Sequence, residues 1–119
     1  MKILFIDDEF GRVPVAKEFY EMHFDVTEFK HITYVPKKFG DYDIISFDND
    51  LGGHLNNDTF IKLSRMLWQG ELHLEGKKVF VHSMNSVAAQ KVCEICLDAG
   101  ASLAQRIPFT VMIKETAYR

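Results

Sequence analysis

Short apolar runs alternate along the chain with segments in which apolar side chains recur at helical spacing. Residues 3–6 and 44–47 are almost entirely apolar, which is typical of strands buried on both faces of a parallel sheet. The pattern predicts further strands at residues 24–29, 77–81 and 103–107, the last of them weaker. The strands therefore recur at intervals long enough to hold a helix between most of them.

Three amphipathic helices are predicted between these strands. The first follows a turn at Gly11 and Pro14, the second covers about residues 57–69, and the third about residues 84–99. Trp68, near the end of the second, is interpreted as a core residue. The last eleven residues show no long amphipathic pattern. Strands that alternate with helices predict an α/β fold with a parallel sheet and right-handed crossovers.

Polar side chains that can take part in catalysis or ligand binding follow four of the five predicted strands. They are Asp7, Asp8, Asp48, Asp50, His82, Ser83 and Arg106. In parallel sheets the carboxyl ends of the strands meet at one edge, and ligands bind in the crevice outside that edge. We therefore expect these side chains to lie together.

Several carboxylates in one crevice repel one another, and a bound cation removes that conflict. Oxygen ligands favour Mg²⁺ or Mn²⁺, and Mg²⁺ commonly keeps a substrate phosphate oxygen in its shell. Together with Arg106, such a cation would make a phosphate site. The alternative is that Asp and Asn follow strands only because they suit turns. Paired acids after two separate strands favour the functional interpretation.

Composition limits the partners. The chain has 119 residues, enough for one domain, with 47% hydrophobic and 26% charged residues. Its formal charge of −3 argues against binding long nucleic acids or an anionic membrane, and leaves room for a small phosphorylated ligand. Two cysteines are too few for a disulfide scaffold or a four-ligand zinc site. Without an apolar run of about 20 residues, a cytoplasmic location is expected.

The chain resembles the response-regulator receiver family at four places: the acid pair Asp7–Asp8, the acid Asp48, the hydroxyl residue Ser83, and the stretch 99–109. The resemblance covers nearly the whole chain. It implies one receiver-like domain over residues 1–119. The implied fold is a flavodoxin-like three-layer α/β sandwich with a five-stranded parallel sheet of order 2-1-3-4-5 and a short or absent last helix.

Details resemble one branch, the cyclic-phosphate-processing receiver domains. The chain shares an acid pair followed by a basic residue and proline at residues 7–14, an Asp-x-Asp-Leu-Gly motif at residues 48–52, and a His-Ser-x-Asn motif at residues 82–85. It departs from the expected pattern in having Asn49 between the two acids, where a His is expected. Ile107 stands where receivers that transfer phosphate have Lys.

The resemblance implies hydrolysis of a cyclic phosphodiester, in a cyclic nucleotide or at a 2′,3′-cyclic phosphate end, with Mg²⁺ or Mn²⁺ as cofactor. The residues assigned are Asp7, Asp8 and Asp48 to the metal, Asp48, Asp50 and His82 to catalysis, and Ser83, Asn85, Arg106, Gly52 and His54 to the phosphate or substrate. Simpler roles remain open for these residues. His82 could contact the backbone, Ser83 and Asn85 could cap a helix, Arg106 could form a surface ion pair, and His54 could lie in a turn.

Two other functions remain open from the sequence. One is a signalling receiver phosphorylated on Asp48, and the other is a module that sequesters a nucleotide without cleaving it. The missing Lys weighs against the first, and Asn49 leaves the second open. The expected partner in the hydrolase is a small phosphorylated ligand, with a homodimer possible. Because such domains occur in bacteria and their phages, the location would be the host cytoplasm if the chain is phage-encoded.

Overall fold

The computed structural model describes residues 1–51 and 58–118. Its elements are β1 (Lys2–Ile6), a 3-10 turn η1 (Phe10–Arg12), α1 (Val13–His23), β2 (Glu28–Ile32), β3 (Ile44–Phe47), α2 (Asp58–Trp68), β4 (Lys78–Val81), α3 (Ser86–Asp98), β5 (Leu103–Arg106) and α4 (Phe109–Ala117). Strands and helices alternate as the apolar pattern predicted, except that β2 is followed directly by β3 with no helix at residues 33–43.

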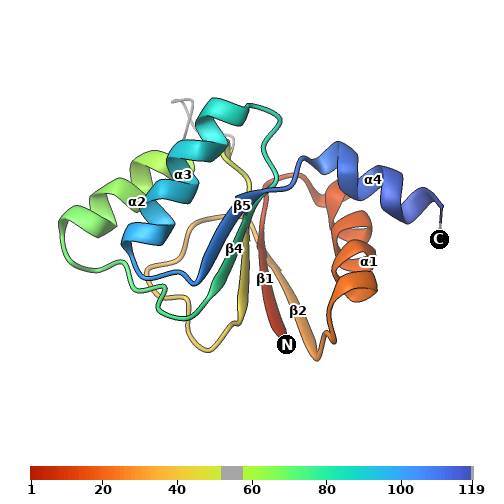
Figure 1. Ribbon diagram of the computed structural model, residues 1–119, viewed down its shortest axis with the longest axis horizontal. Coiled ribbons are helices and arrows are strands. Elements are labelled where there is room, and N and C mark those ends of the chain that lie inside the picture. Colours follow the sequence, from red (N-terminus) through yellow and green to blue (C-terminus); the bar gives the residue numbers. More distant parts are fainter. Residues whose placement is uncertain (52–57, 119) are drawn as a thin grey trace.

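The five strands form one sheet of order β2-β1-β3-β4-β5, and every pairing is parallel. This confirms the order implied by the receiver resemblance. Helices α2 and α3 cover one face of the sheet, and α1 and α4 cover the other (Figure 1). The molecule is therefore a three-layer sandwich with the carboxyl ends of all strands at one edge.

Each face of the sheet has its own core. On the α2 and α3 side, Ile45, Phe47 and Leu63 pack without solvent exposure. On the α1 and α4 side, Phe5 and Tyr20 are equally buried. Fully burying side chains of this size contributes about 1.5–3 kcal/mol each. The central strands β1, β3 and β4 are buried on both faces, so their continuous apolar runs follow directly from their position.

Strand β2 begins four residues later than the prediction at residue 24. The amide of Phe24 donates to the carbonyl of Tyr20 at 2.9 Å and so ends α1 instead of starting a strand. Phe24 and Val26 still pack against the α1 core, which accounts for their apolar character. The ladder itself pairs Lys2 with Glu28 and Ile6 with Ile32, at the edge of the sheet.

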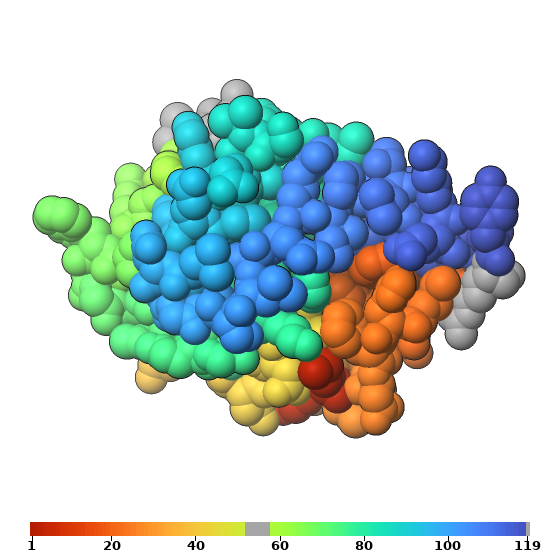
Figure 2. Space-filling model, viewed as in Figure 1, coloured from red at the N-terminus to blue at the C-terminus, as the bar shows by residue number. Residues whose placement is uncertain are grey.

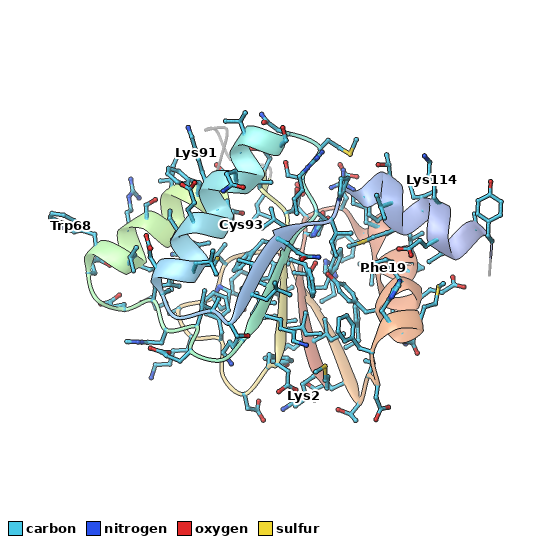
Figure 3. All side chains as sticks on the ribbon, in the orientation of Figure 1. Lys2, Phe19, Trp68, Lys91, Cys93 and Lys114 are labelled. Atoms are coloured by element: carbon cyan, nitrogen blue, oxygen red, sulfur yellow. The ribbon has the colours of Figure 1, made fainter. Side chains whose placement is uncertain are left out.

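Trp68 is 92% exposed, so its assignment to the core was wrong. It extends away from the end of α2 into solvent (Figure 3). Its neighbour Met66 is buried in its place, because only one side of α2 faces the sheet. The apolar run Met66–Trp68 did not show from the sequence which of its members would point inward.

The last helix exists and is short, with nine residues in α4. It lies beside α1, and Met112 is its one fully buried side chain among the described residues. Figure 2 shows its surface continuing from that of β5 and α3 across the molecule. Across the described part of the chain, each helix is too short or too polar to span a bilayer.

Candidate functional site

Three side chains from adjacent strands meet just beyond the carboxyl edge of the sheet. Asp7, Asp48 and His82 follow β1, β3 and β4, and each offers an oxygen or nitrogen atom within 4.8 Å of the others. Their amides continue the ladder by donating to the carbonyls of Ile32, Ile6 and Phe47 at 3.1, 2.9 and 3.0 Å. The sheet therefore holds these three residues in place through the backbone.

Asp7 is fully buried and surrounded by donors. One carboxylate oxygen accepts from the amide of Glu9 at 2.8 Å. The other lies 2.8 Å from Nε2 of His82 and 3.3 Å from the Arg12 guanidinium. Burial alone would raise the pKa of Asp7, but the bonds from His82 and Glu9 outweigh it and hold the pKa below its usual value. Asp7 is therefore a carboxylate at neutral pH.

His82 is buried within a chain of hydrogen bonds that leads away from Asp7 into the core. The hydroxyl of Tyr20 donates to Ser46 Oγ at 2.7 Å, and that oxygen lies 3.1 Å from Nδ1 of His82. Phe5 stacks on the imidazole with ring centroids 4.8 Å apart. Burial lowers the pKa of His82, so the ring is neutral. An ionised Asp7 requires a proton on Nε2, and Ser46 then donates to Nδ1.

Asp48 has a poorer set of partners than Asp7. It is 8% exposed, and its nearest cation in the described chain is Arg12, 3.5 Å away. Burial and the negative charges of Asp7 and Asp8 raise its pKa to about 7, against the opposing effect of Arg12. The same Arg12 is thus shared among three carboxylates, those of Asp7, Asp48 and the exposed Glu9. The ring of Phe109 lies 5.4 Å from its guanidinium carbon.

This arrangement suits a divalent cation. Two buried carboxylates converge on one point, and the raised pKa of Asp48 shows that the local positive charge is insufficient. Oxygen ligands favour Mg²⁺ or Mn²⁺. With its Nε2 hydrogen bonded to Asp7, His82 would orient that ligand; imidazole nitrogen is also itself a possible metal ligand. Asp8 is half-buried at the same edge and lies outside the close trio.

The turn between β4 and α3 is held by three residues that the sequence assigned to phosphate. The side chain of Asn85 caps α3 by accepting from the amides of Val87 and Ala88, both at 3.1 Å. Ser83 Oγ accepts from the amide of Asn85 at 3.1 Å. Arg106 donates to the carbonyls of Ser83 and Met84 at 2.9 and 2.8 Å. Capping and turn stabilisation are therefore established roles for all three.

The start of α2 is tied to the acid cluster. The hydroxyl of Thr59 donates to the carbonyl of Asp48, and its amide donates to the carbonyl of Asn49 at 3.2 Å. Thr59 is fully buried and Asn49 is 2% exposed. The first turn of α2 therefore has a set position relative to Asp48, although the chain between residues 52 and 57 is outside the described residues.

Three predicted site residues remain. Asp50 is exposed at the edge of the site. Gly52 and His54 lie outside the described residues. Sequence reasoning gave no role to Arg12, although it stands in the quoted motif at residues 7–14, and none to the Tyr20–Ser46 pair behind His82. For Arg12, the only signal in the sequence was a basic residue a few positions after an acid pair. For the Tyr20–Ser46 pair, no local pattern gave a signal.

Comparison with known families decides the relationship. A family model described as the cyclic-phosphate processing receiver domain matches residues 2–98. The chain belongs to this family. The interpretation drawn from its three motifs is thereby confirmed. All three residues of the trio lie within the matched part of this cyclic-phosphate processing receiver domain. No curated protein matches the chain by sequence.

Solved structures agree on the fold of this receiver domain. A signal receiver domain from Vibrio parahaemolyticus has a TM-score of 0.52 at 12% identity, covering 98% of this chain and 87% of the other. The RcsB response regulator of Salmonella typhimurium has a TM-score of 0.54 at 16% identity, covering 99% and 56%. A short-chain flavodoxin has a TM-score of 0.51 at 15% identity, covering 95% and 91%. At these identities the likeness concerns the fold alone.

Proposed function

We propose that this receiver domain is a metal-dependent hydrolase that opens a cyclic phosphodiester, in a cyclic nucleotide or at a 2′,3′-cyclic phosphate end. The observation that carries the proposal is the buried trio of Asp7, Asp48 and His82 at the carboxyl edge of the sheet. Membership of the cyclic-phosphate processing family supports the substrate class. The raised pKa of Asp48 supports the need for a cation.

In the proposed reaction a water molecule adds to phosphorus, and the bond from phosphorus to one ester oxygen of the ring breaks. That oxygen takes up a proton, so the product is a phosphomonoester beside a free hydroxyl. Asp7 and Asp48 would hold the cation. When bound, Mg²⁺ or Mn²⁺ would neutralise charge on the phosphoryl oxygens and lower the pKa of a neighbouring water.

Other residues of the chain would orient the metal ligand, orient the attacking water and bind the phosphoryl oxygens. His82, through its bond to Asp7, holds that carboxylate in one orientation. Asp50, exposed beside the acids, would orient the attacking water. The hydroxyl of Ser83 and the amino end of α3 would bind phosphoryl oxygens as their charge develops. Arg106 would support this turn through the carbonyl of Ser83 and contribute its positive charge.

The test is a hydrolysis assay with Mg²⁺ or Mn²⁺ and three substrates: a 2′,3′-cyclic nucleotide, a 3′,5′-cyclic nucleotide and an RNA with a 2′,3′-cyclic end. We expect product with at least one, and none in a chelator. Asp48→Asn should lower the rate by about 100-fold or more, because a charged ligand is lost. Asp98→Asn, an exposed acid at the end of α3, is the matched control and should keep full activity.

Two outcomes would replace the hydrolase with another function. Retention of intact nucleotide without product would indicate a sequestering module. Stable labelling of Asp48 by acetyl phosphate, again without hydrolysis, would indicate a phosphorylated receiver. Isothermal calorimetry with MgCl₂ and MnCl₂ gives an independent measurement: absence of cation uptake by the wild-type protein would contradict the proposal at its first step.

A further inference from the structure

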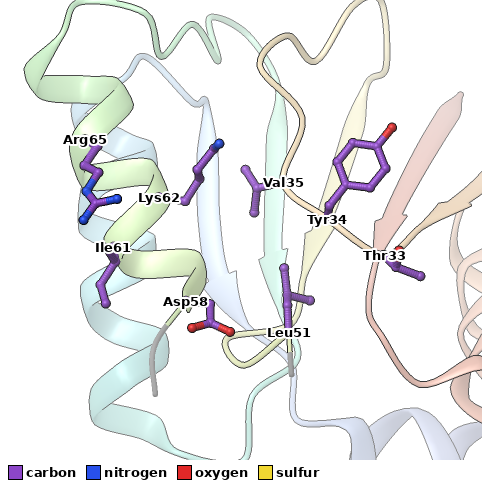
Figure 4. Close-up of a pocket in the computed structure, with 8 residues that line it drawn as sticks. All are labelled: Thr33, Tyr34, Val35, Leu51, Asp58, Ile61, Lys62 and Arg65. Atoms are coloured by element: carbon purple, nitrogen blue, oxygen red, sulfur yellow. The ribbon is translucent and has the colours of Figure 1, made fainter. Parts of the chain in front are cut away.

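A cavity of about 370 Å³ lies between α2 and the segment that follows β2. Ile61, Lys62 and Arg65 form its wall on α2, and Thr33, Tyr34 and Val35 form the opposite wall (Figure 4). Leu51 and Asp58 lie at one end. Neither the metal trio nor the turn after β4 contributes to it. This cavity is therefore separate from the acid cluster.

The cavity is close to the acid cluster along two paths of the chain. Leu51 lies three residues after Asp48, so even an extended backbone separates them by only about 10 Å. On α2, Thr59 is bonded to the carbonyl of Asp48, and Lys62 follows it by three residues, just under one helical turn of about 5.4 Å. A ligand held at the acid cluster could therefore extend into this cavity.

The lining combines positive charge, an aromatic ring and apolar surface. Lys62 and Arg65 form no ion pair within the described parts of the chain. Asp58 is the acid of the lining, so the cavity carries a net charge of about +1 in a chain of net charge −3. Tyr34 is 62% exposed. Tyr34 lies on the wall opposite Lys62 and Arg65, with its ring directed away from α2 (Figure 4). Cations and exposed aromatic rings are the side chains that bind phosphates and bases in single-stranded nucleotide sites.

We propose that this cavity binds the rest of the nucleotide whose cyclic phosphate lies at the acid cluster. A phosphate on the 5′ side of that nucleotide would contact Lys62 and Arg65, and its base would lie against Tyr34. The inference rests on the proposed hydrolase function and makes it narrower. A nucleoside 2′,3′-cyclic phosphate with a 5′-phosphate, as at the 3′ end of an RNA, carries this second anion. A 3′,5′-cyclic mononucleotide does not, because its single phosphate spans both positions.

Two paired measurements test the cavity. The first compares the kcat/KM of adenosine 2′,3′-cyclic phosphate with that of the same compound bearing a 5′-phosphate. We expect the 5′-phosphate to raise kcat/KM about tenfold or more in the wild-type protein, the worth of a charge-assisted hydrogen bond. In Lys62→Met and Arg65→Gln this gain should shrink, while the rate with the unphosphorylated compound stays within about twofold.

The second measures binding of adenosine 5′-monophosphate in a chelator, by amide shifts of α2 in NMR. Binding should weaken about fivefold or more in Lys62→Met and Arg65→Gln, and stay unchanged in Lys114→Gln, an exposed lysine of α4 across the sheet (Figure 3). This measurement does not need hydrolysis, so it still tests the cavity if the hydrolase proposal fails. No gain from the 5′-phosphate, or binding unaffected by both substitutions, would overturn the inference.

Discussion

The ends of β1 and β3 are neighbours in the sheet, yet the acids that follow them differ in hydrogen-bond donors and in pKa. Asp7, after β1, has bonds from His82 and from the amide of Glu9, and its pKa is held below its usual value. Asp48, after β3, is favoured as a carboxylate by Arg12 at 3.5 Å and by the amide of Asn49, but burial and the repulsion of Asp7 and Asp8 outweigh them and raise its pKa to about 7. A carboxylate is stabilised by donors that the fold aims at it, and burial without them has the opposite effect.

The difference assigns separate tasks to the two acids. Asp7 is a carboxylate without any cation, because His82 and the amide of Glu9 donate to it. Ionised Asp48 is disfavoured by burial and by the negative charges of Asp7 and Asp8, and a divalent cation would offset most of this repulsion. Cation binding should therefore be coupled to deprotonation of Asp48 and should strengthen as pH rises through about 7.

Removing His82 should produce the largest effect on this comparison. His82→Ala leaves a fully buried Asp7 carboxylate without its closest donor and opens a cavity beside Phe5. We expect a loss of about 3–5 kcal/mol in the free energy of unfolding. Urea unfolding at pH 7 measures it, with His73→Ala as the exposed histidine control at near zero. Equal losses in the two variants would show that His82 gives Asp7 no special support.

The second largest effect should be on how the free energy of unfolding depends on pH. The folded pKa of Asp48, about 7, lies above the usual 3.8, so the folded state holds its proton longer than the unfolded state does. Its contribution is thus complete below about pH 4 and is lost as pH rises through 7. Asp7 has the opposite sign: its contribution is present above its usual pKa of 3.8 and is lost as pH falls through its lower folded pKa.

Substitution of Asp48 isolates that dependence. In a chelator, Asp48→Asn should become more stable than wild type between pH 5 and pH 9, by about 2–4 kcal/mol at the upper end. Urea unfolding at several pH values gives the two curves, and Asp98→Asn again serves as the control acid. Parallel curves for wild type and Asp48→Asn across this range would mean that Asp48 is ionised throughout, as Asp7 is.

The smallest effect concerns the far end of the hydrogen-bond chain. Tyr20→Phe removes the hydroxyl that donates to Ser46 and leaves the ring in its core position. We expect a loss of about 1 kcal/mol in unfolding free energy and a measurable weakening of Mg²⁺ or Mn²⁺ uptake in calorimetry. Phe19→Leu removes a ring that packs edge-on against Tyr20, with centroids 5.3 Å apart, but leaves the hydrogen bonds of Tyr20, Ser46 and His82 in place. It should change stability and leave cation affinity unaltered. Identical cation affinities in Tyr20→Phe and wild type would mean that the hydrogen bond from Tyr20 to Ser46 does not contribute to the orientation of Asp7.

Much of the fold could be predicted from the chain because the central strands are buried on both faces. Continuous apolar runs at β1, β3 and β4 are distinctive, and acids directly after them fall at one edge by the geometry of a parallel sheet. The edge strand β2 lacks such a run, and its start was misplaced. Trp68 was misplaced because periodicity alone does not decide between neighbouring apolar side chains at the end of a helix.

By itself, the sequence determined the alternation of strands and helices, the family, and the strand ends that carry the acids. These depend on local pattern and on sheet geometry, which a chain expresses residue by residue. Only the tertiary structure decided that Tyr20, Ser46 and His82 form a hydrogen-bond chain behind Asp7, that Arg12 lies between Asp7 and Asp48, and that residues 33–35 and α2 line one cavity. Each of these joins residues distant in sequence, and their protonation states follow from burial and neighbours that no local pattern encodes.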